Sequence, residues 1–246
     1  MTGPSNIEWT EYTWNPTTGC DPISPGCDNC YAEDLSLRLQ AMSRPKYKNG
    51  FKFTVHEKDL NWPLTIKKPA MIFTNSMSDF GHQDMPLNFF DAIVGTMELA
   101  KQHTFQVLTK RPIVIKQMLQ KLERDLPSNV WLGVSVENRD YLWRVDVLKQ
   151  IKASVRFISY EPALGPLGMV NLSDIHWIIA GGESGPHFRS PQPEWFREIR
   201  DQCVAQGAAF FFKQWGGRTP KAGGRILDGR THDEYPIITM ALGNFI

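Results

Sequence analysis

The sequence lacks several features that would place it in a specialised class of protein. Its 246 residues include only four cysteines, no internal repeat, and no apolar run near the roughly 18 residues needed to span a bilayer. With 27 basic and 26 acidic side chains the net charge is +1, so overall charge does not indicate a nucleic-acid partner. The start, MTGPSNIEWTEYTW, carries no recognisable export signal. We therefore expect a soluble cytoplasmic protein with no membrane contact.

From residue 70 onward, short apolar runs alternate with segments that have helical spacing of apolar residues. The pattern predicts strands over 71–75, 104–109, 130–136, 155–160, 177–180 and 209–213, with an earlier strand within 7–14. It predicts helices over 31–42, 86–102, 112–124, 138–151 and 193–206. This alternation is typical of βα units around a parallel sheet, so we expect a TIM-like parallel β/α barrel, complete or partial.

A chain of this length can form one such barrel, so we expect a single domain over residues 1–246. Two segments do not fit the βα pattern. Residues 43–69 are polar, basic and interrupted by prolines, which predicts an irregular basic insertion. Residues 216–246 begin with a stretch rich in glycine and polar side chains, which predicts an irregular tail.

The strongest chemical signal is a trio of cysteines, Cys20, Cys27 and Cys30, in the segment GCDPISPGCDNCYAE. In a reducing compartment such a cluster indicates a metal or catalytic site rather than a disulfide framework. Thiolates are soft ligands that suit iron-sulfur clusters and zinc, and three of them leave one coordination position open. A structural zinc ion completed by His82 or His232 is the alternative.

Polar residues also follow the predicted strands at their carboxyl ends, where active sites of parallel α/β folds gather. Lys110 and Arg111 can hold a carboxylate or phosphate, or cap the next helix. Glu161 and Lys213 are candidate catalytic residues, because a carboxylate beside an apolar strand needs a partner or a function. Further candidates at strand ends are Ser76, Ser78, Asp79, Ser135, Glu137, Gly182 and Glu183, and the candidates for stacking a base are Trp14, Trp62 and Trp215.

Three close cysteines followed at once by the aromatic Tyr31, after an N-terminal strand and before a train of βα units, resemble the radical S-adenosylmethionine enzymes. The usual spacing there is C-x3-C-x2-C, whereas this chain has six residues in the first gap. The chain also resembles an uncharacterised phage-associated family with a three-cysteine motif, through IEWTEYTWNPTTGC, FTNSMSD, VLTKRP, WLGVSVEN, FISYEP, IIAGGESG and FFKQWGG.

The resemblance to radical S-adenosylmethionine enzymes implies that the three cysteines hold a 4Fe-4S cluster whose open iron binds the amino and carboxylate groups of S-adenosylmethionine. The reduced cluster would then cleave this cofactor to a 5'-deoxyadenosyl radical, with flavodoxin or ferredoxin as the kind of electron donor required. By this resemblance Ser76, Ser78 and Asp79 lie where the methionine amino group is commonly contacted, with capping of a helix in an ordinary βα loop as the alternative. The other candidate cofactor-binding residues are Tyr31, Ser135, Glu137, Gly182 and Glu183.

The implied phage association and the basic insertion favour a nucleotide or a DNA base as the substrate, for modification or repair. Two other classes of function use the same cysteines. One is a zinc-dependent hydrolase or nuclease, with a water in the open position. The other is a non-catalytic, metal-stabilised module that binds nucleic acid.

Overall fold

The structure is a computed structural model, and it describes residues 2–237. Its main feature is a sheet of eight strands in the order β1-β2-β5-β6-β7-β8-β9-β10. Every neighbouring pair is parallel except β1 and β2. The strands are β1 (Gly3–Pro4), β2 (Tyr12–Trp14), β5 (Met71–Thr74), β6 (Thr104–Thr109), β7 (Val130–Ser135), β8 (Val155–Tyr160), β9 (Trp177–Gly181) and β10 (Ala209–Gln214).

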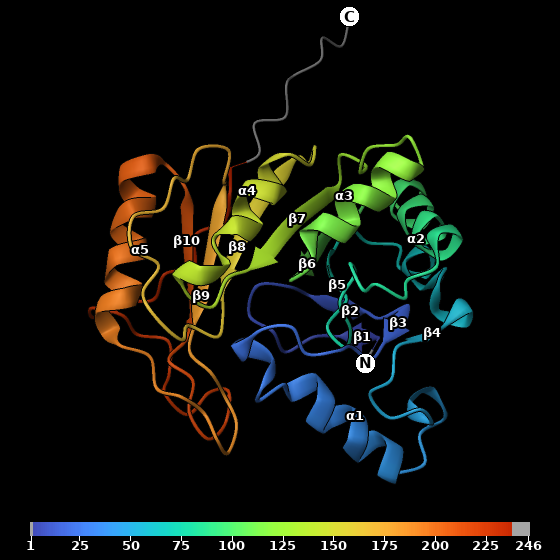
Figure 1. The fold of residues 1–246 in the computed structure, drawn as a ribbon, viewed down its shortest axis with the longest axis horizontal. Helices are drawn as coiled ribbons and strands as arrows, with labels where there is room; N and C mark the ends of the chain where they lie inside the picture. Colours follow the sequence, from blue (N-terminus) through green and yellow to red (C-terminus); the bar gives the residue numbers. More distant parts are fainter. Residues whose placement is uncertain (1, 238–246) are drawn as a thin grey trace, which may run out of the picture.

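Four of the five helices lie around the outside of this sheet, and α1 lies apart from them (Figure 1). The helices are α1 (Tyr31–Ala41), α2 (Leu87–Leu99), α3 (Pro112–Lys121), α4 (Trp143–Lys149) and α5 (Pro193–Gln206). Proline occupies the first position of α3 and α5, where its missing N–H costs nothing. The C-cap of α5 is Gly207, whose φ of 77° is the left-handed conformation that glycine adopts without strain.

Alternate residues of the strands belong to two separate hydrophobic cores, as expected for a sheet covered on both faces. On β8, Ile158 packs in the core shared with the helices, whereas Phe157 points to the inner face of the sheet. The inner core gathers Trp9, Phe73, Trp131 and Trp177 from distant parts of the sheet. Trp9 meets both Phe73 and Trp177, at centroid distances of 4.7 and 6.2 Å. The inner face is therefore strongly curved.

The α/β class and the mostly parallel sheet are confirmed, but a complete barrel is not formed by the described residues. β1 pairs with β2 at one edge and β10 pairs with β9 at the other, and the two edge strands do not pair with each other. The outer side of β10 forms one antiparallel bridge, from Phe211 to Asp233 of the tail, so the sheet stays open between its first and last strands. Beside the opening, Nζ of Lys221 lies 3.8 Å from Oε1 of Glu8. The two sides of the opening are thus connected by this ion pair and not by backbone hydrogen bonds between strands. The predicted helix over 138–151 splits into the short helix η5 (Arg139–Tyr141) and α4.

The predicted insertion over 43–69 contains short, ordered elements. It holds the 3-10 helices η2 (Pro45–Tyr47), η3 (Glu57–Asp59) and η4 (Trp62–Thr65) and the strand β4 (Thr54–Val55), which pairs with β3 (Thr17–Thr18). The described part of the tail packs on the sheet, with Leu227 fully buried and the Trp177 indole donating to the carbonyl of Glu234 at 2.8 Å. Residues 238–246 of the predicted tail lie outside the described residues.

No helix within residues 2–237 has the length and apolar character needed to cross a membrane.

Candidate active site

The carboxyl ends of the parallel strands open into a cavity of about 730 Å³. One wall is the loop that carries the three cysteines, which connects β3 to α1. The other walls are strand ends and the turns that follow them. All but one of the thirteen residues predicted to bind metal or cofactor or to act in catalysis line this cavity, namely Cys20, Cys27, Cys30, Tyr31, Ser76, Ser78, Asp79, Ser135, Glu161, Gly182, Glu183 and Lys213.

Cys20 lies beside the buried guanidinium of Arg111. Nη1 of Arg111 donates to Sγ of Cys20 at 3.2 Å and to Oδ2 of Asp79 at 3.1 Å, and Nη2 donates to the carbonyl of Asp21 at 2.6 Å. Burial, and secondly the charge of Asp79, raise the pKa of the Cys20 thiol to about 11, although Arg111 opposes this shift. Without a bound metal, this cysteine is therefore a neutral thiol at pH 7.

Asp79 accepts four hydrogen bonds from the protein. Its carboxylate accepts hydrogen bonds from the Thr109 hydroxyl at 2.5 Å and from the backbone amides of Gly81 and Lys110 at 2.8 and 2.9 Å, in addition to the bond from Arg111. A carboxylate with several such donors is held in its charged form and in one orientation. Its place in the structure is behind Arg111, which it fixes beside Cys20.

Ser76 and Ser78 line the cavity but also take part in bonds to the segment after β2. The hydroxyl of Ser76 bonds to the side-chain amide of Asn15, at 3.0 Å from its Nδ2. The hydroxyl of Ser78 lies 2.7 Å from that of Thr17. Tyr31 reaches into the same region, since its hydroxyl donates to the carbonyl of Ser76 at 2.7 Å. Burial of this hydroxyl raises the pKa of Tyr31, so it is a hydrogen-bond donor throughout the physiological range.

Cys27 is positioned by a buried polar group beneath the cysteine loop. Ser24 lies 3.8 Å from Sγ of Cys27 and donates its hydroxyl to Oε1 of Glu137 at 2.5 Å. Glu137 is fully buried, and Arg144 donates to its Oε2 at 2.8 Å. Glu137 is the one predicted site residue that does not line the cavity. A Cβ added at Gly26 would lie 2.6 Å from Cγ of Glu137, so only glycine allows the loop to approach this carboxylate.

Cys30 occupies the N-cap position of α1. Burial raises the pKa of its thiol, while the backbone amides of Glu33 and Ala32 and the charge of Lys110 act in the opposite direction. A helix N-terminus presents free amides and a partial positive charge, which stabilises a thiolate or another anion there. The N-terminus of α1 therefore favours the thiolate of Cys30, as the guanidinium of Arg111 favours the thiolate of Cys20.

The loop after β9 holds the cysteine loop from its other side. Glu183 is buried, and its carboxylate accepts bonds from the Arg189 guanidinium at 2.5 and 2.8 Å and from Asn29 at 3.1 Å. Arg189 also donates to the carbonyl of Pro25 at 2.8 Å and to the carboxylate of Asp28 at 3.2 Å. Burial raises the pKa of Glu183, but the bonds from Arg189 and Asn29 outweigh it and hold the pKa below its usual value. We call Glu183, Arg189, Asp28 and Asn29 the latch.

The predicted catalytic residues form a pair in the cavity lining. Nζ of Lys213, on β10, lies 2.5 Å from Oε1 of Glu161, which follows β8. Both side chains are mostly enclosed, with 17% and 19% of their surfaces exposed. The ammonium donates a hydrogen bond to the carboxylate, and the two groups hold each other in place as an ion pair.

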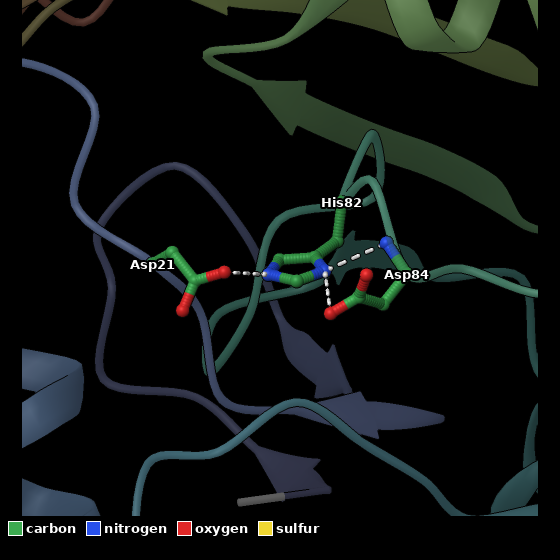
Figure 2. Close-up of side chains that lie close together, drawn as sticks. All are labelled: Asp21, His82 and Asp84. Atoms are coloured by element: carbon green, nitrogen blue, oxygen red, sulfur yellow. Dashed lines mark hydrogen bonds and ion pairs between the residues drawn. The ribbon is translucent and has the colours of Figure 1, made fainter.

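A second cluster of possible metal ligands lies next to the cysteine loop. Among the described residues, the ligand atoms of Asp21, His82 and Asp84 come within 4.8 Å of one another. Figure 2 shows the two aspartates at opposite ends of the His82 ring: Nε2 lies 3.2 Å from Asp21, and Nδ1 accepts from the backbone N–H of Asp84 at 3.1 Å. The lone pair of Nδ1 is thus already used by the backbone of Asp84, and the contact at Nε2 holds Asp21 beside the cysteine site.

Neither histidine that was considered as a fourth zinc ligand is placed to complete the cysteine site. Both ring nitrogens of His82 face aspartates, as described above. His232 packs against Phe210, which belongs to the helix-side core, on the face of the sheet away from the cavity. The cavity lining within residues 2–237 contains no histidine and no fourth cysteine.

The donor set of the site is three thiols, with no histidine and no fourth cysteine in the described cavity lining. Thiolates suit both iron-sulfur clusters and zinc, and three of them leave one coordination position open for another ligand.

Several residues that organise the site were not singled out from the sequence. Ser24, Arg144 and Arg189 act through contacts with residues far along the chain, and no local pattern reveals such contacts. Ser159 is different, because it lies one residue from the end of β8 and could have been found by the strand-end argument. The tryptophans proposed to stack a base, Trp14, Trp62 and Trp215, do not line the cavity, whereas Trp9 does.

The fold and the site together define an α/β protein with three thiols at the carboxyl ends of an open parallel sheet. Residues 4–236 match the family described as "Protein of unknown function (DUF5131)", and the chain belongs to this family. No curated protein matches the chain in sequence.

Solved structures of spore photoproduct lyase are similar in shape. A mutant with dinucleoside spore photoproduct has 12% identity and a TM-score of 0.48, over 74% of this chain and 59% of that chain. A mutant with bound AdoMet and the dinucleoside has 12% identity and a TM-score of 0.45, over 74% and 58%. Another mutant reaches a TM-score of 0.49 at 11% identity, over 85% and 78%. This chain thus spans less than two thirds of the first of these proteins. A likeness of this extent carries no information about which ligands this chain binds.

Proposed function

We propose that the protein is a radical S-adenosylmethionine enzyme in which Cys20, Cys27 and Cys30 hold a 4Fe-4S cluster. The observation that carries the proposal is the arrangement of three thiols, with no histidine and no fourth cysteine among the described lining residues, on the wall of a cavity at the carboxyl ends of parallel strands. When bound and reduced, such a cluster supplies the electron that cleaves S-adenosylmethionine to methionine and a 5'-deoxyadenosyl radical.

The chain's own residues have three roles in this proposal. Arg111 and the N-terminus of α1 stabilise the negative charge of the thiolates at Cys20 and Cys30. The latch and the Ser24–Glu137 bond fix the loop, so that the three sulfurs keep their spacing. The apolar inner core beneath the cavity, with Trp9 and Phe73 at its top, keeps water away from reactive species from below.

The Lys213–Glu161 pair is the group that can exchange a proton with a bound substrate. Lys213 can donate a proton to the substrate at Nζ, and Glu161 can accept one from it at the oxygen that Lys213 does not occupy. We propose a nucleotide or a DNA base as the substrate, to be modified or repaired, and an electron donor of the flavodoxin or ferredoxin type.

The proposal is tested by purifying the protein without oxygen, reconstituting it with iron and sulfide, and measuring metal content. We expect brown protein with about four irons and four sulfides per chain, as a 4Fe-4S cluster requires. Cys27→Ala is expected to lose most of this iron. Cys203→Ala is the matched control, because Cys203 is a buried cysteine on α5 with no part in the site. Colourless protein that contains one zinc per chain would instead support a zinc-dependent hydrolase or nuclease.

A further inference from the structure

The cavity lining contains two serine hydroxyls that take part in none of the contacts above. Ser135 ends β7 and Ser159 lies on β8, and the two are direct partners in the register of these strands. Neighbouring strands lie about 4.8 Å apart, so the two hydroxyls are close to each other. We call Ser135, Ser159, Glu161 and Lys213 the serine wall.

The two hydroxyls of the serine wall face the cavity. Both serines line it, and their residues are only 4% and 3% exposed. Neither hydroxyl is hydrogen-bonded to another described group, and neither hydroxyl oxygen is fully buried. Each hydroxyl is therefore open to the cavity. Each hydroxyl can donate one hydrogen bond and accept others, so a ligand could use both.

The ion pair extends this wall with a fixed donor and a fixed acceptor. One oxygen of Glu161 is bonded to Lys213, and the other is left to accept from a ligand. Together the wall presents hydroxyls, an ammonium and a carboxylate oxygen at the rim of neighbouring strands. The hydrogen-bonding edge of a nucleobase alternates donors and acceptors over a similar width.

Beneath the serine wall the cavity has an apolar floor. Trp9, Phe73 and Leu108 line the cavity, and the Trp9 and Phe73 rings pack edge-on at a centroid distance of 4.7 Å. A flat heteroaromatic ring has two apolar faces and a polar edge. It can therefore pack a face on these apolar side chains while its edge forms hydrogen bonds with the serine wall.

The charges in the cavity oppose the binding of phosphates within it. Its described lining has four cationic side chains, Lys110, Arg111, Lys213 and Lys221, and six acidic ones, Glu8, Asp21, Glu33, Asp79, Glu161 and Glu183. Three of the cations already face a carboxylate of this lining, namely Arg111 with Asp79, Lys213 with Glu161 and Lys221 with Glu8. The fourth, Lys110, lies 3.9 Å from the buried Glu137. A triphosphate would meet more negative than positive charge.

We infer that the serine wall, including Ser135 that the sequence suggested for the cofactor, is the subsite for the base edge of the substrate. This substrate is a nucleoside or an unpaired nucleobase whose phosphates stay outside the cavity. This inference rests on the proposed function only for the reaction that follows binding. The contacts that define the subsite are present in the protein without a cluster.

The inference is tested by equilibrium binding to the full chain without a cluster, measured by ligand-observed NMR or calorimetry. The probes are thymidine and thymidine 5'-triphosphate, since a pyrimidine does not imitate the adenosine of the cofactor. We compare the unchanged protein with Ser135→Ala, Ser159→Ala and the double variant. Ser173→Ala is the matched control, because Ser173 lies outside the cavity lining. The two single variants keep the test valid if the double variant fails to fold.

We expect saturable binding of thymidine to the unchanged protein. The dissociation constant of thymidine 5'-triphosphate is expected to lie within about threefold of that of thymidine, and the double variant is expected to bind thymidine at least about tenfold more weakly. Each single variant is expected to weaken binding by a smaller factor, and Ser173→Ala to leave it unchanged. A triphosphate that binds more than tenfold tighter, a double variant that binds as well as the unchanged protein, or no saturable thymidine binding would overturn the inference. Formation of 5'-deoxyadenosine, measured separately with the cluster present, tests the proposed function, so the two failures are distinguishable.

Discussion

The guanidinium of Arg111 donates a hydrogen bond to the sulfur of Cys20 at 3.2 Å. The two residues are far apart in the chain, and the contact forms because the cysteine loop crosses the carboxyl end of β6. Asp79 fixes the guanidinium from behind at 3.1 Å. A positive charge held at this distance favours the thiolate over the thiol, and so favours metal binding.

Replacing Arg111 with methionine is therefore expected to weaken iron binding. Residues that support a metal ligand typically contribute about 10- to 100-fold in affinity, and we expect a loss of this order. Arg111→Lys keeps the charge but not the forked geometry, so an intermediate loss is expected. The measurement is the chelator concentration that removes half the iron. An unchanged midpoint in Arg111→Met would show that Arg111 does not support Cys20.

Arg189→Met removes the guanidinium of the latch that bonds to the cysteine loop at Pro25 and Asp28. Charge-assisted hydrogen bonds are worth about 1.5–3 kcal/mol, so losing them increases the fraction of molecules in which the cysteine loop is locally unfolded. We therefore expect hydrogen exchange of the amides in residues 20–30 to become at least about tenfold faster. Arg197→Met is a suitable control, since Arg197 bonds to Glu194 and Asp228 away from the loop. Equal exchange rates in Arg189→Met and the unchanged protein would refute the role of the latch.

Glu183→Gln tests the same latch through pH. The folded pKa of Glu183 is lowered, so its carboxylate stabilises the fold above about pH 4.5, and this contribution is lost as the pH falls through the folded pKa. We expect the variant to unfold several degrees lower at pH 7, for a loss on the order of 1–3 kcal/mol. The difference should shrink below pH 4.5. Thermal unfolding from pH 3 to 8 measures it, with the exposed Glu57→Gln as control.

Gly26→Ala tests the close approach of the cysteine loop to Glu137. The added Cβ would lie 2.6 Å from Cγ of this fully buried carboxylate, so the loop must shift. We expect a destabilisation of about 1–3 kcal/mol and reduced iron loading. Gly95→Ala is the control, because a Cβ there meets no atom within 4 Å in the middle of α2 and is expected to stabilise by about 0.5–1 kcal/mol. Normal iron loading in Gly26→Ala would contradict the account of this contact.

The strands were predictable because they are buried on both faces and their apolar runs are nearly continuous. The strand over 104–109 and the one over 155–160 have the predicted bounds, and α5 begins at its predicted proline. The convergence of strand-end residues on one cavity also follows from the sequence, because parallel strands direct their carboxyl ends to one edge. The open gap between β1 and β10 was not predictable, because barrel closure depends on strand tilt and register, which no local pattern encodes.

The partners of the candidate residues were the least predictable part. Asp79 and Glu137 were expected to contact the cofactor, but in the structure Arg111 and Arg144 bind them, with Thr109 and Ser24 as further donors. A sequence reveals that a carboxylate follows a strand, but not which distant donor reaches it. Whether these carboxylates also contact a cofactor stays a prediction.

The most direct test of the central claim is anaerobic incubation of the reconstituted protein with dithionite and S-adenosylmethionine, followed by quantification of 5'-deoxyadenosine. We expect the unchanged protein and Cys203→Ala to form 5'-deoxyadenosine, and Cys20→Ala, Cys27→Ala and Cys30→Ala to form none above background. Protein that carries its full complement of iron and sulfide but forms no 5'-deoxyadenosine, or equal formation by the three cysteine variants, would contradict the account.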